Sequence, residues 1–211
     1  MTKTAGGTLK TALRETPEGM VQFIYGEDDL NRIRQLDLSS TKLVYGHTVF
    51  GVHERLKLPA KYICFLRHPV TRTISHYYHL RNVDQGPVGE KIRKSSDIND
   101  FFANFKHWEF SNFMTKIVSG LGAVPVGRDS GGLELAIKNL DTSFSFVGFQ
   151  EFFPLSVRRM SKIIGIDINL KKDINIGRYS LSDVLPETLA KIEKLNEVDL
   201  ALYRHCIGRY L

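Results

Sequence analysis

The chain has little of several features that would place it in a broad class. It contains only two cysteines, Cys64 and Cys206, far apart and without a Cys-x-x-Cys pair, so no disulfide framework is expected. No apolar run approaches the roughly 18 residues of a membrane span. Nothing ahead of residue 3 could act as a signal peptide. As written, the sequence predicts a cytoplasmic protein without a transmembrane segment.

Size and charge set further bounds. The 211 residues are 42% hydrophobic, which is enough for one good core, so a single domain over residues 1–211 is expected. The net charge of +6, from 29 basic and 23 acidic side chains, favours anionic ligands or partners. An ordinary basic soluble protein would have the same composition, and we expect no nucleic-acid partner.

Short apolar runs alternate along the chain with segments of helical periodicity. Strands are expected at 21–25, 42–45, 62–66 and 144–149, and helices at 7–15, 28–36, 69–82, 98–108, 133–140, 154–165 and 186–207, with loops over 83–97 and 119–132. This alternation predicts an α/β domain of three layers, in which helices flank a mainly parallel central sheet. Ligands of such domains gather at the carboxyl ends of the strands.

The first stretch that could bind an anion is rich in glycine. It consists of Lys3, Thr4, Ala5, Gly6, Gly7 and Thr8, and it runs into the first expected helix. Glycines let successive N–H groups turn toward one point, the helix adds its positive end, and the lysine adds a mobile charge. A phosphate or sulfonate would fit, although an ordinary turn has the same composition. The stretch is not a Walker A loop, because Lys3 precedes the glycines.

A second candidate anion site follows the strand expected over 62–66. Arg67 stands at the strand end, Pro69 opens a helix, and Ser75 comes eight residues after the arginine. A planar guanidinium can bind two phosphate oxygens, and a serine hydroxyl can donate to a third. Alternatively, Arg67 is a simple strand-end charge and Ser75 is a solvated helix residue.

In this order, the two stretches resemble the nucleotide-binding motifs of sulfotransferases that use 3'-phosphoadenosine 5'-phosphosulfate (PAPS). Lys-Thr-x-Gly-x-Thr-Leu is similar to the 5'-phosphosulfate loop, and the Arg67-to-Ser75 segment is similar to the 3'-phosphate motif. Other segments resemble the carbohydrate branch, the heparan and chondroitin type enzymes: Tyr-Gly-His at 45–47, Asn-Phe-Met-Thr-Lys-Ile-Val-Ser-Gly at 112–120, Phe-Val-Gly-Phe-Gln-Glu-Phe-Phe at 146–153 and Asp-Leu-Ala-Leu-Tyr at 199–203. The resemblance covers almost the whole chain and implies a P-loop-like domain.

The resemblance also implies a role for each site residue. Lys3 would act at the bridging oxygen of PAPS, and Arg67 and Ser75 would hold the 3'-phosphate. His47 would be the general base, since histidine near its ordinary pKa of about 6.5 accepts a proton at neutral pH. The 5'-phosphate would be surrounded by Thr4, Ala5, Gly6, Gly7 and Thr8, with Arg178 as a further basic residue near the site. The acceptor would be a hydroxyl of a glycan or small metabolite, the product 3',5'-diphosphoadenosine (PAP), and no metal would be needed.

The chain departs from the family pattern at two points. In the family a strand, usually ending in proline, precedes the loop, whereas here Met1 stands two residues before Lys3. The first strand of the sheet is therefore expected to be missing. His68 replaces the usual aspartate of Arg-Asp-Pro; it is a poorer helix N-cap, but its neutral ring would repel a phosphate less.

Other interpretations stay open on the sequence alone. A catalytically inactive relative could bind acidic polysaccharide through its basic surface, and a P-loop-type kinase is a second enzyme alternative. His76 and His79 are three residues apart and could hold a metal, but we expect them to be solvated. An aromatic group is expected to be core: Phe101, Phe102, Phe105, Trp108, Phe110 and Phe113. The basic run Lys91, Arg93 and Lys94 is expected in a loop, where it would meet solvent or an anionic acceptor.

Overall fold

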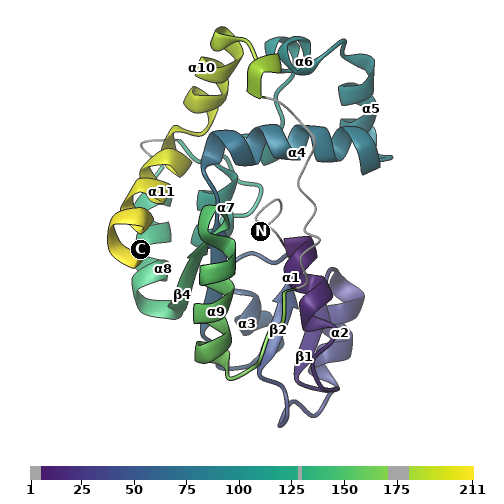
Figure 1. The fold of residues 1–211 in the computed structure, drawn as a ribbon, viewed down its shortest axis with the longest axis vertical. Helices are drawn as coiled ribbons and strands as arrows, with labels where there is room; N and C mark the ends of the chain where they lie inside the picture. The colour runs from purple at the N-terminus through teal and green to yellow at the C-terminus, as the bar shows by residue number, and fades with distance from the viewer. Residues whose placement is uncertain (1–5, 128–129, 171–180) are drawn as a thin grey trace.

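The structure is a computed structural model that describes residues 6–127, 130–170 and 181–211. These residues form a mixed α/β fold (Figure 1). The strands are β1 Val21–Ile24, β2 Leu43–Gly46, β3 Tyr62–Leu66 and β4 Phe144–Phe149. The α-helices are α1 Gly6–Leu13, α2 Glu27–Arg34, α3 Val52–Leu56, α4 Pro69–Val83, α5 Pro87–Lys94, α6 Ile98–Asn104, α7 Phe113–Ser119, α8 Gly132–Ser143, α9 Phe153–Ile164, α10 Pro186–Leu195 and α11 Glu197–Tyr210. Three short 3-10 helices also occur, η1 Trp108–Phe110, η2 Gln150–Phe152 and η3 Leu181–Asp183.

The strands form two parallel pairs, and the expected α/β class is confirmed. β1 pairs with β2 from Val21↔Leu43 to Ile24↔Gly46, and β3 pairs with β4 up to Leu66↔Phe149. The sequence predicted one mainly parallel sheet, whereas the described strands make two sheets of two strands each. Gly46 permits the first pair to close, because a Cβ there would lie 1.8 Å from the carbonyl oxygen of Ile24.

Helices cover both faces of the strands. Because successive side chains of a strand point to opposite faces, odd and even positions of β1, β2 and β3 enter different parts of the core. Odd positions such as Tyr45 and Phe65 pack with Leu9 of α1 and with residues of α9. Even positions pack on the other side, where Val44 meets α2 and α3 and Cys64 meets α7, α8 and α11.

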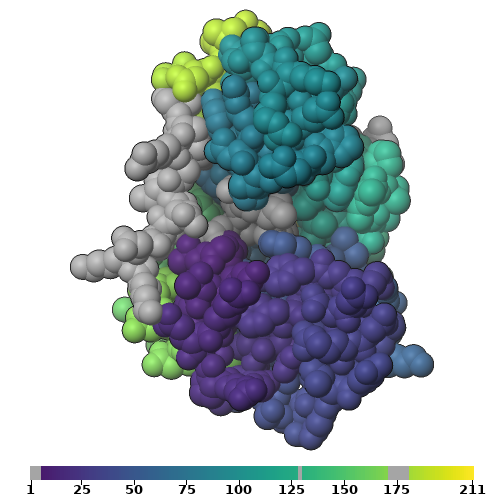
Figure 2. Space-filling model, turned by 90° about the vertical axis from the view of Figure 1, so that its right-hand side faces the viewer, coloured from purple at the N-terminus to yellow at the C-terminus, as the bar shows by residue number. Residues whose placement is uncertain are grey.

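A group of helices, α4, α5, α6 and α10, stands beyond the strand ends (Figure 1). Figure 2 shows the face on which α5 and α6 lie above the N-terminal elements α1, α2 and α3. The aromatic group supplies much of this core: Phe101, Phe102 and Phe110 are buried with Tyr77 and Ile92. Phe113 is buried as well, while Phe105 and Trp108 are half-buried. The prediction that these rings belong to the core is confirmed for the four buried rings and for Phe105, which packs against the same core.

The stretch 83–97 was expected to be a loop but contains α5. Asp84 accepts hydrogen bonds from the N–H groups of Gly86 (3.0 Å) and Gly89 (2.6 Å), which holds the first turn. Ile92 is fully buried and fixes the helix on the core. The basic run therefore lies on a helix, where the Lys94 ammonium is 2.6 Å from the Glu90 carboxylate.

The closing helix expected over 186–207 is two helices, α10 and α11, that meet at Asn196. This side chain is fully buried. Its amide donates to the carbonyl of Phe110 (3.0 Å) and its oxygen accepts from the N–H of Asn112 (3.1 Å). These bonds attach the break to the start of α7. Of the described helices, none is both long and apolar enough to cross a membrane.

The starts of α7 and α11 cap each other through buried side chains. Asn112 Oδ1 accepts from the N–H groups of Val198 (3.1 Å) and Asp199 (3.2 Å) in α11. In return, Asp199 accepts from the N–H of Met114 (2.9 Å) and from the N–H and hydroxyl of Thr115 (2.7 Å each) in α7. The segments 112–120 and 199–203 therefore meet in a structural contact.

Candidate functional site

The candidate site lies at the carboxyl ends of the strands. Tyr25 follows β1, His47 follows β2, Arg67 follows β3, and Glu151 lies two residues beyond β4. Within each parallel pair the two carboxyl ends lie at the same edge, which is where α/β proteins bind their ligands. Three of these four positions carry side chains able to bind an anion or take a proton.

The start of α1 is fixed at this edge by Tyr45. The Tyr45 hydroxyl on β2 donates to the Gly6 carbonyl at 2.6 Å. Gly6, Gly7 and Thr8 form the first turn of α1, and first-turn N–H groups have no acceptor within their helix. Gly7 is exposed, and a Cβ built on it would meet nothing described within 4 Å. This turn can therefore present N–H groups to an anion.

Part of the predicted anion loop lies outside the described residues. Lys3, Thr4 and Ala5 belong to that part, as does Arg178. Their assigned roles stay predictions from the sequence.

His47 is brought against α1 by two neighbours. Its ring meets the Tyr25 ring edge-on at 5.6 Å between centroids, and the Lys10 ammonium of α1 lies 4.2 Å from the centre of that same tyrosine ring. The histidine predicted as the base and the helix predicted to bind the donor are thus adjacent.

The surroundings of His47 hold its ring neutral. Although part of the residue stays exposed, the surrounding protein displaces water from the imidazole, and Lys10 adds positive charge. Desolvation is the largest cause that lowers the pKa of His47 to about 4, from an ordinary value near 6.5, and the positive charge of Lys10 adds to it. At neutral pH the ring is therefore able to accept a proton, but it is a weaker base than its ordinary pKa would make it.

Arg67 and Ser75 lie on one β3–α4 unit. Arg67 is half-buried directly after β3, and Ser75 is only 6% exposed in the second turn of α4. The alternative that Ser75 is a solvated helix residue is therefore wrong. Its helical neighbour Arg72 is fully buried. The Arg72 guanidinium donates to the Glu109 carbonyl at 2.5 Å and lies 4.1 Å from the Phe113 ring centre, so Arg72 stabilises the core.

Glu151 has a role that the sequence did not indicate. Its carboxylate accepts from the His68 N–H at 2.7 Å, at the N-cap of α4, where the His68 side chain makes no capping bond. A carboxylate two residues beyond β4 thus accepts from the backbone of the residue that precedes α4. Burial and Glu151 together raise the pKa of Tyr203.

The other histidines near the site are engaged elsewhere. His53 Nδ1 lies 2.6 Å from the Tyr62 hydroxyl, which also accepts from the N–H groups of Gly51 and His53 at the start of α3. His76 is buried, with its Nε2 2.8 Å from the Glu109 carboxylate, so the expectation that it is solvated is wrong; His79 is exposed. The described residues hold no group of three His, Cys, Asp or Glu placed to bind a metal.

No protein-family model matches this chain, and no curated protein matches it. Its function must be inferred from the residues of the site.

Proposed function

We propose that this protein is a PAPS-dependent sulfotransferase that transfers a sulfuryl group to a hydroxyl of a carbohydrate acceptor. The observation that carries this proposal is the link from Lys10 of α1 through Tyr25 to His47, at the carboxyl ends of β1 and β2, while Arg67 follows the carboxyl end of β3. An anion-binding turn, a neutral imidazole and an arginine are the groups that the reaction needs. The motifs that resemble the family support the same roles.

Sulfuryl transfer is an in-line displacement. The acceptor oxygen forms a bond to sulfur while the bond from sulfur to the 5'-phosphate oxygen of PAPS breaks, and PAP leaves. His47 takes the hydroxyl proton, and the N–H groups of Gly6, Gly7 and Thr8 with Lys3 stabilise the charge that grows on the departing phosphate. Arg67 and Ser75 hold the 3'-phosphate and so orient the donor.

The 3'-phosphate contact gives the first test. PAP should bind more tightly than 5'-adenylate, and Arg67→Ala should remove most of that difference, because a charge-assisted hydrogen bond contributes roughly 1.5 to 3 kcal/mol. This corresponds to a change of roughly 10- to 150-fold in the ratio of the two dissociation constants. Isothermal titration calorimetry with both nucleotides measures it.

Arg158→Ala is the matched control for this test. Arg158 is an exposed arginine on α9, and its removal should leave the ratio unchanged. Equal affinity of the unmutated protein for PAP and 5'-adenylate would refute the assignment to PAPS. Magnesium-dependent ATP binding in its place would favour the kinase alternative.

The lysine of the anion loop gives the second test. Lys3→Ala should weaken PAPS binding and lower turnover by roughly 10²- to 10³-fold, because a charged donor at the reacting centre acts on both ground and transition states. Sulfate transfer from labelled PAPS to a panel of glycans and small alcohols measures turnover. Lys162→Ala, at an exposed position of α9, should change neither PAPS affinity nor turnover. If Lys3→Ala were as active as this control, the glycine-rich loop would not be part of the active site.

A further inference from the structure

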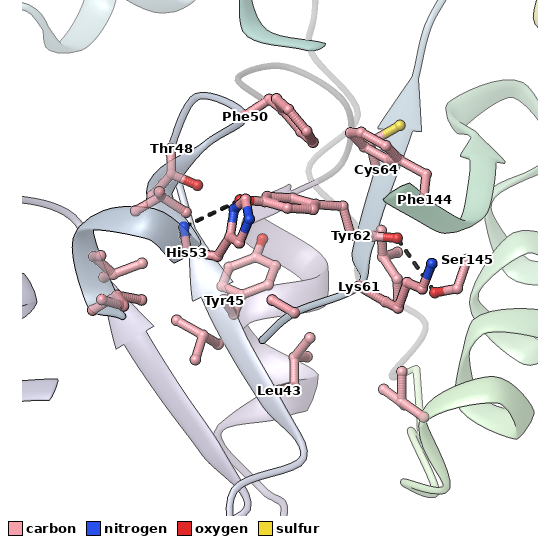
Figure 3. Close-up of a pocket in the computed structure, with 18 of the residues that line it drawn as sticks. Leu43, Tyr45, Thr48, Phe50, His53, Lys61, Tyr62, Cys64, Phe144 and Ser145 are labelled. Atoms are coloured by element: carbon pink, nitrogen blue, oxygen red, sulfur yellow. Dashed lines mark hydrogen bonds between the residues drawn. The ribbon is translucent and has the colours of Figure 1, made fainter. Parts of the chain in front are cut away.

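The helix α9 carries different kinds of side chain on its two sides. Toward the interior, Phe153, Val157 and Met160 are buried with residues of α1 and β3. Met160 and Ile164 also line the cavity of about 800 Å³ that Figure 3 shows. The opposite side of α9, which lies in front of the strands in Figure 1, is exposed to solvent.

Five exposed residues make up this solvent side. They follow one another at positions i, i+3, i+4, i+7 and i+8, which is the spacing of a single helix face. We call them the α9 outer face: Leu155, Arg158, Arg159, Lys162 and Ile163.

The three cations of the α9 outer face have no counter-ion. Within the part of the chain that the structure describes, the side chains of Arg158, Arg159 and Lys162 make no hydrogen bond or ion pair. Elsewhere an exposed cation is paired, as Lys94 is with Glu90 on α5. Arg158 and Lys162 are four residues apart, and like charges at this spacing destabilise a helix. An anionic partner would relieve this repulsion.

The acidic residues nearest in sequence lie beyond both ends of α9. Glu151 precedes the helix and accepts from the N–H of His68, and Asp167 follows the C-cap at Gly165. A fourth cation, Lys42, reaches this end of α9, where its ammonium donates to the Gly165 carbonyl at 2.9 Å. No residue of α9 itself is acidic, so its own sequence leaves the positive charge of the face unopposed.

Apolar side chains distinguish this face from a purely cationic one. Leu155 is 45% exposed, Ile163 is 50% exposed and also lines the cavity, and Phe152, directly before α9, is 43% exposed. A soluble polyanion needs only the cations, whereas a lipid bilayer takes cations at its headgroups and apolar side chains beneath them. A basic helix face with apolar side chains at its ends is therefore typical of a membrane surface.

We propose that the α9 outer face docks on an anionic lipid bilayer. Arg158, Arg159 and Lys162 bind the anionic headgroups, and Phe152 and Leu155 enter the layer below them. The inference goes beyond the sulfotransferase assignment and does not depend on it, and its test uses no nucleotide.

Co-sedimentation of the full chain with lipid vesicles tests the proposal. Vesicles of phosphatidylcholine with about one third phosphatidylserine should bind the protein more tightly than vesicles of phosphatidylcholine alone, and added salt should weaken the binding by screening. Each cation near an anionic surface contributes about fivefold to the partition coefficient. Arg158→Ala, Arg159→Ala and Lys162→Ala combined should therefore weaken binding on the order of 100-fold.

The matched control removes three exposed cations from other helices. It combines Lys138→Ala on α8, Lys194→Ala on α10 and Arg204→Ala on α11, so it has the same net charge as the first triple variant. Both variants replace exposed side chains and should melt close to the unmutated chain. The control should bind the anionic vesicles nearly as tightly as the unmutated chain does.

A second variant tests the lipid against a soluble polyanion. Phe152→Ser with Leu155→Ser keeps every cation and should weaken binding to the anionic vesicles by about tenfold, because less apolar surface is buried. Its binding to dextran sulfate, a polyanion without an apolar layer, should equal that of the unmutated chain.

Three results would overturn the proposal. The first is an unmutated chain that binds neither kind of vesicle, or both equally. The second is equal loss of binding in the two triple variants, which would mean that net charge alone attracts the chain. The third is unchanged vesicle binding of the serine variant, which would assign the α9 outer face to a soluble polyanion.

Discussion

His47→Ala is expected to lower sulfate transfer by about 10²- to 10⁴-fold, the usual share of general acid–base catalysis, while PAPS affinity stays close to that of the unmutated protein. Tyr25 contacts both the His47 ring and Lys10 of α1. With a pKa of about 4, the His47 ring is neutral at physiological pH. Turnover with labelled PAPS, paired with calorimetry of PAP, separates the loss of the base from the loss of donor binding.

The pH profile gives this prediction a second readout. A base must be deprotonated, so kcat/KM of the unmutated enzyme should rise with pH through an acid limb near pH 4, below the limb near 6.5 that an unperturbed histidine would give. The bound donor is anionic and favours the imidazolium, so the limb in kcat should lie at higher pH than the limb in kcat/KM. His47→Ala should lack the limb in both.

His79→Ala is the control for the loss of a histidine. His79 is exposed on α4, and its replacement should leave turnover and both limbs in place. Full turnover of His47→Ala on an accepted substrate would show that another residue is the base. His53 would be tested next, although its Nδ1 lies 2.6 Å from the Tyr62 hydroxyl.

Asp199→Ala is expected to give the largest loss of stability, roughly 3 to 5 kcal/mol in the free energy of unfolding. The buried carboxylate accepts three hydrogen bonds from Met114 and Thr115 at the start of α7, and each buried donor left without an acceptor costs about 1 to 3 kcal/mol. For a chain of this size the melting temperature should fall by on the order of 10 °C. Thermal and urea unfolding measure both quantities.

The reciprocal cap also predicts how two variants combine. Asn112→Ala removes the acceptor for the N–H groups of Val198 and Asp199. The double variant should lose less stability than the sum of the single losses, because both caps hold the same pair of helix starts. Asp167→Ala, at an exposed aspartate, is the control and should melt within a degree or two of the unmutated chain. An Asp199 variant as stable as this control would contradict the reciprocal cap.

Much of the local structure could be predicted from the sequence. All four expected strands are present within one residue of the expected ends, because apolar runs such as 62–66 carry their signal in neighbouring residues. A helix beginning at the glycine pair, expected over 7–15 and found at Gly6–Leu13, and the helix opened by Pro69 were predicted for the same reason. Among the site residues, Gly6, Gly7, Thr8, His47, Arg67 and Ser75 lie in the helix starts, strand ends and helix that the sequence assigned to them.

Contacts between residues far apart in the sequence decided the features that sequence patterns did not predict. The break at Asn196 depends on bonds to Phe110 and Asn112, more than eighty residues earlier, and no pattern within 186–207 carries that information. The capping of His68 by Glu151 likewise joins two strand ends. The pKa of His47 falls because other segments remove water from its ring. The extent of this desolvation cannot be read from the spacing of residues in the sequence.

The sequence by itself determined where the chain forms strands and helices, and which residues stand at strand ends, because periodicity and glycine or proline signals act over a few residues. Only the tertiary structure decided that the strands form two pairs, with a cavity lined by residues of both β2 and β3. It also decided that Tyr25 links His47 to Lys10 of α1. Strand pairing and desolvation both depend on which distant segments pack together, and that is settled only when the whole core is assembled.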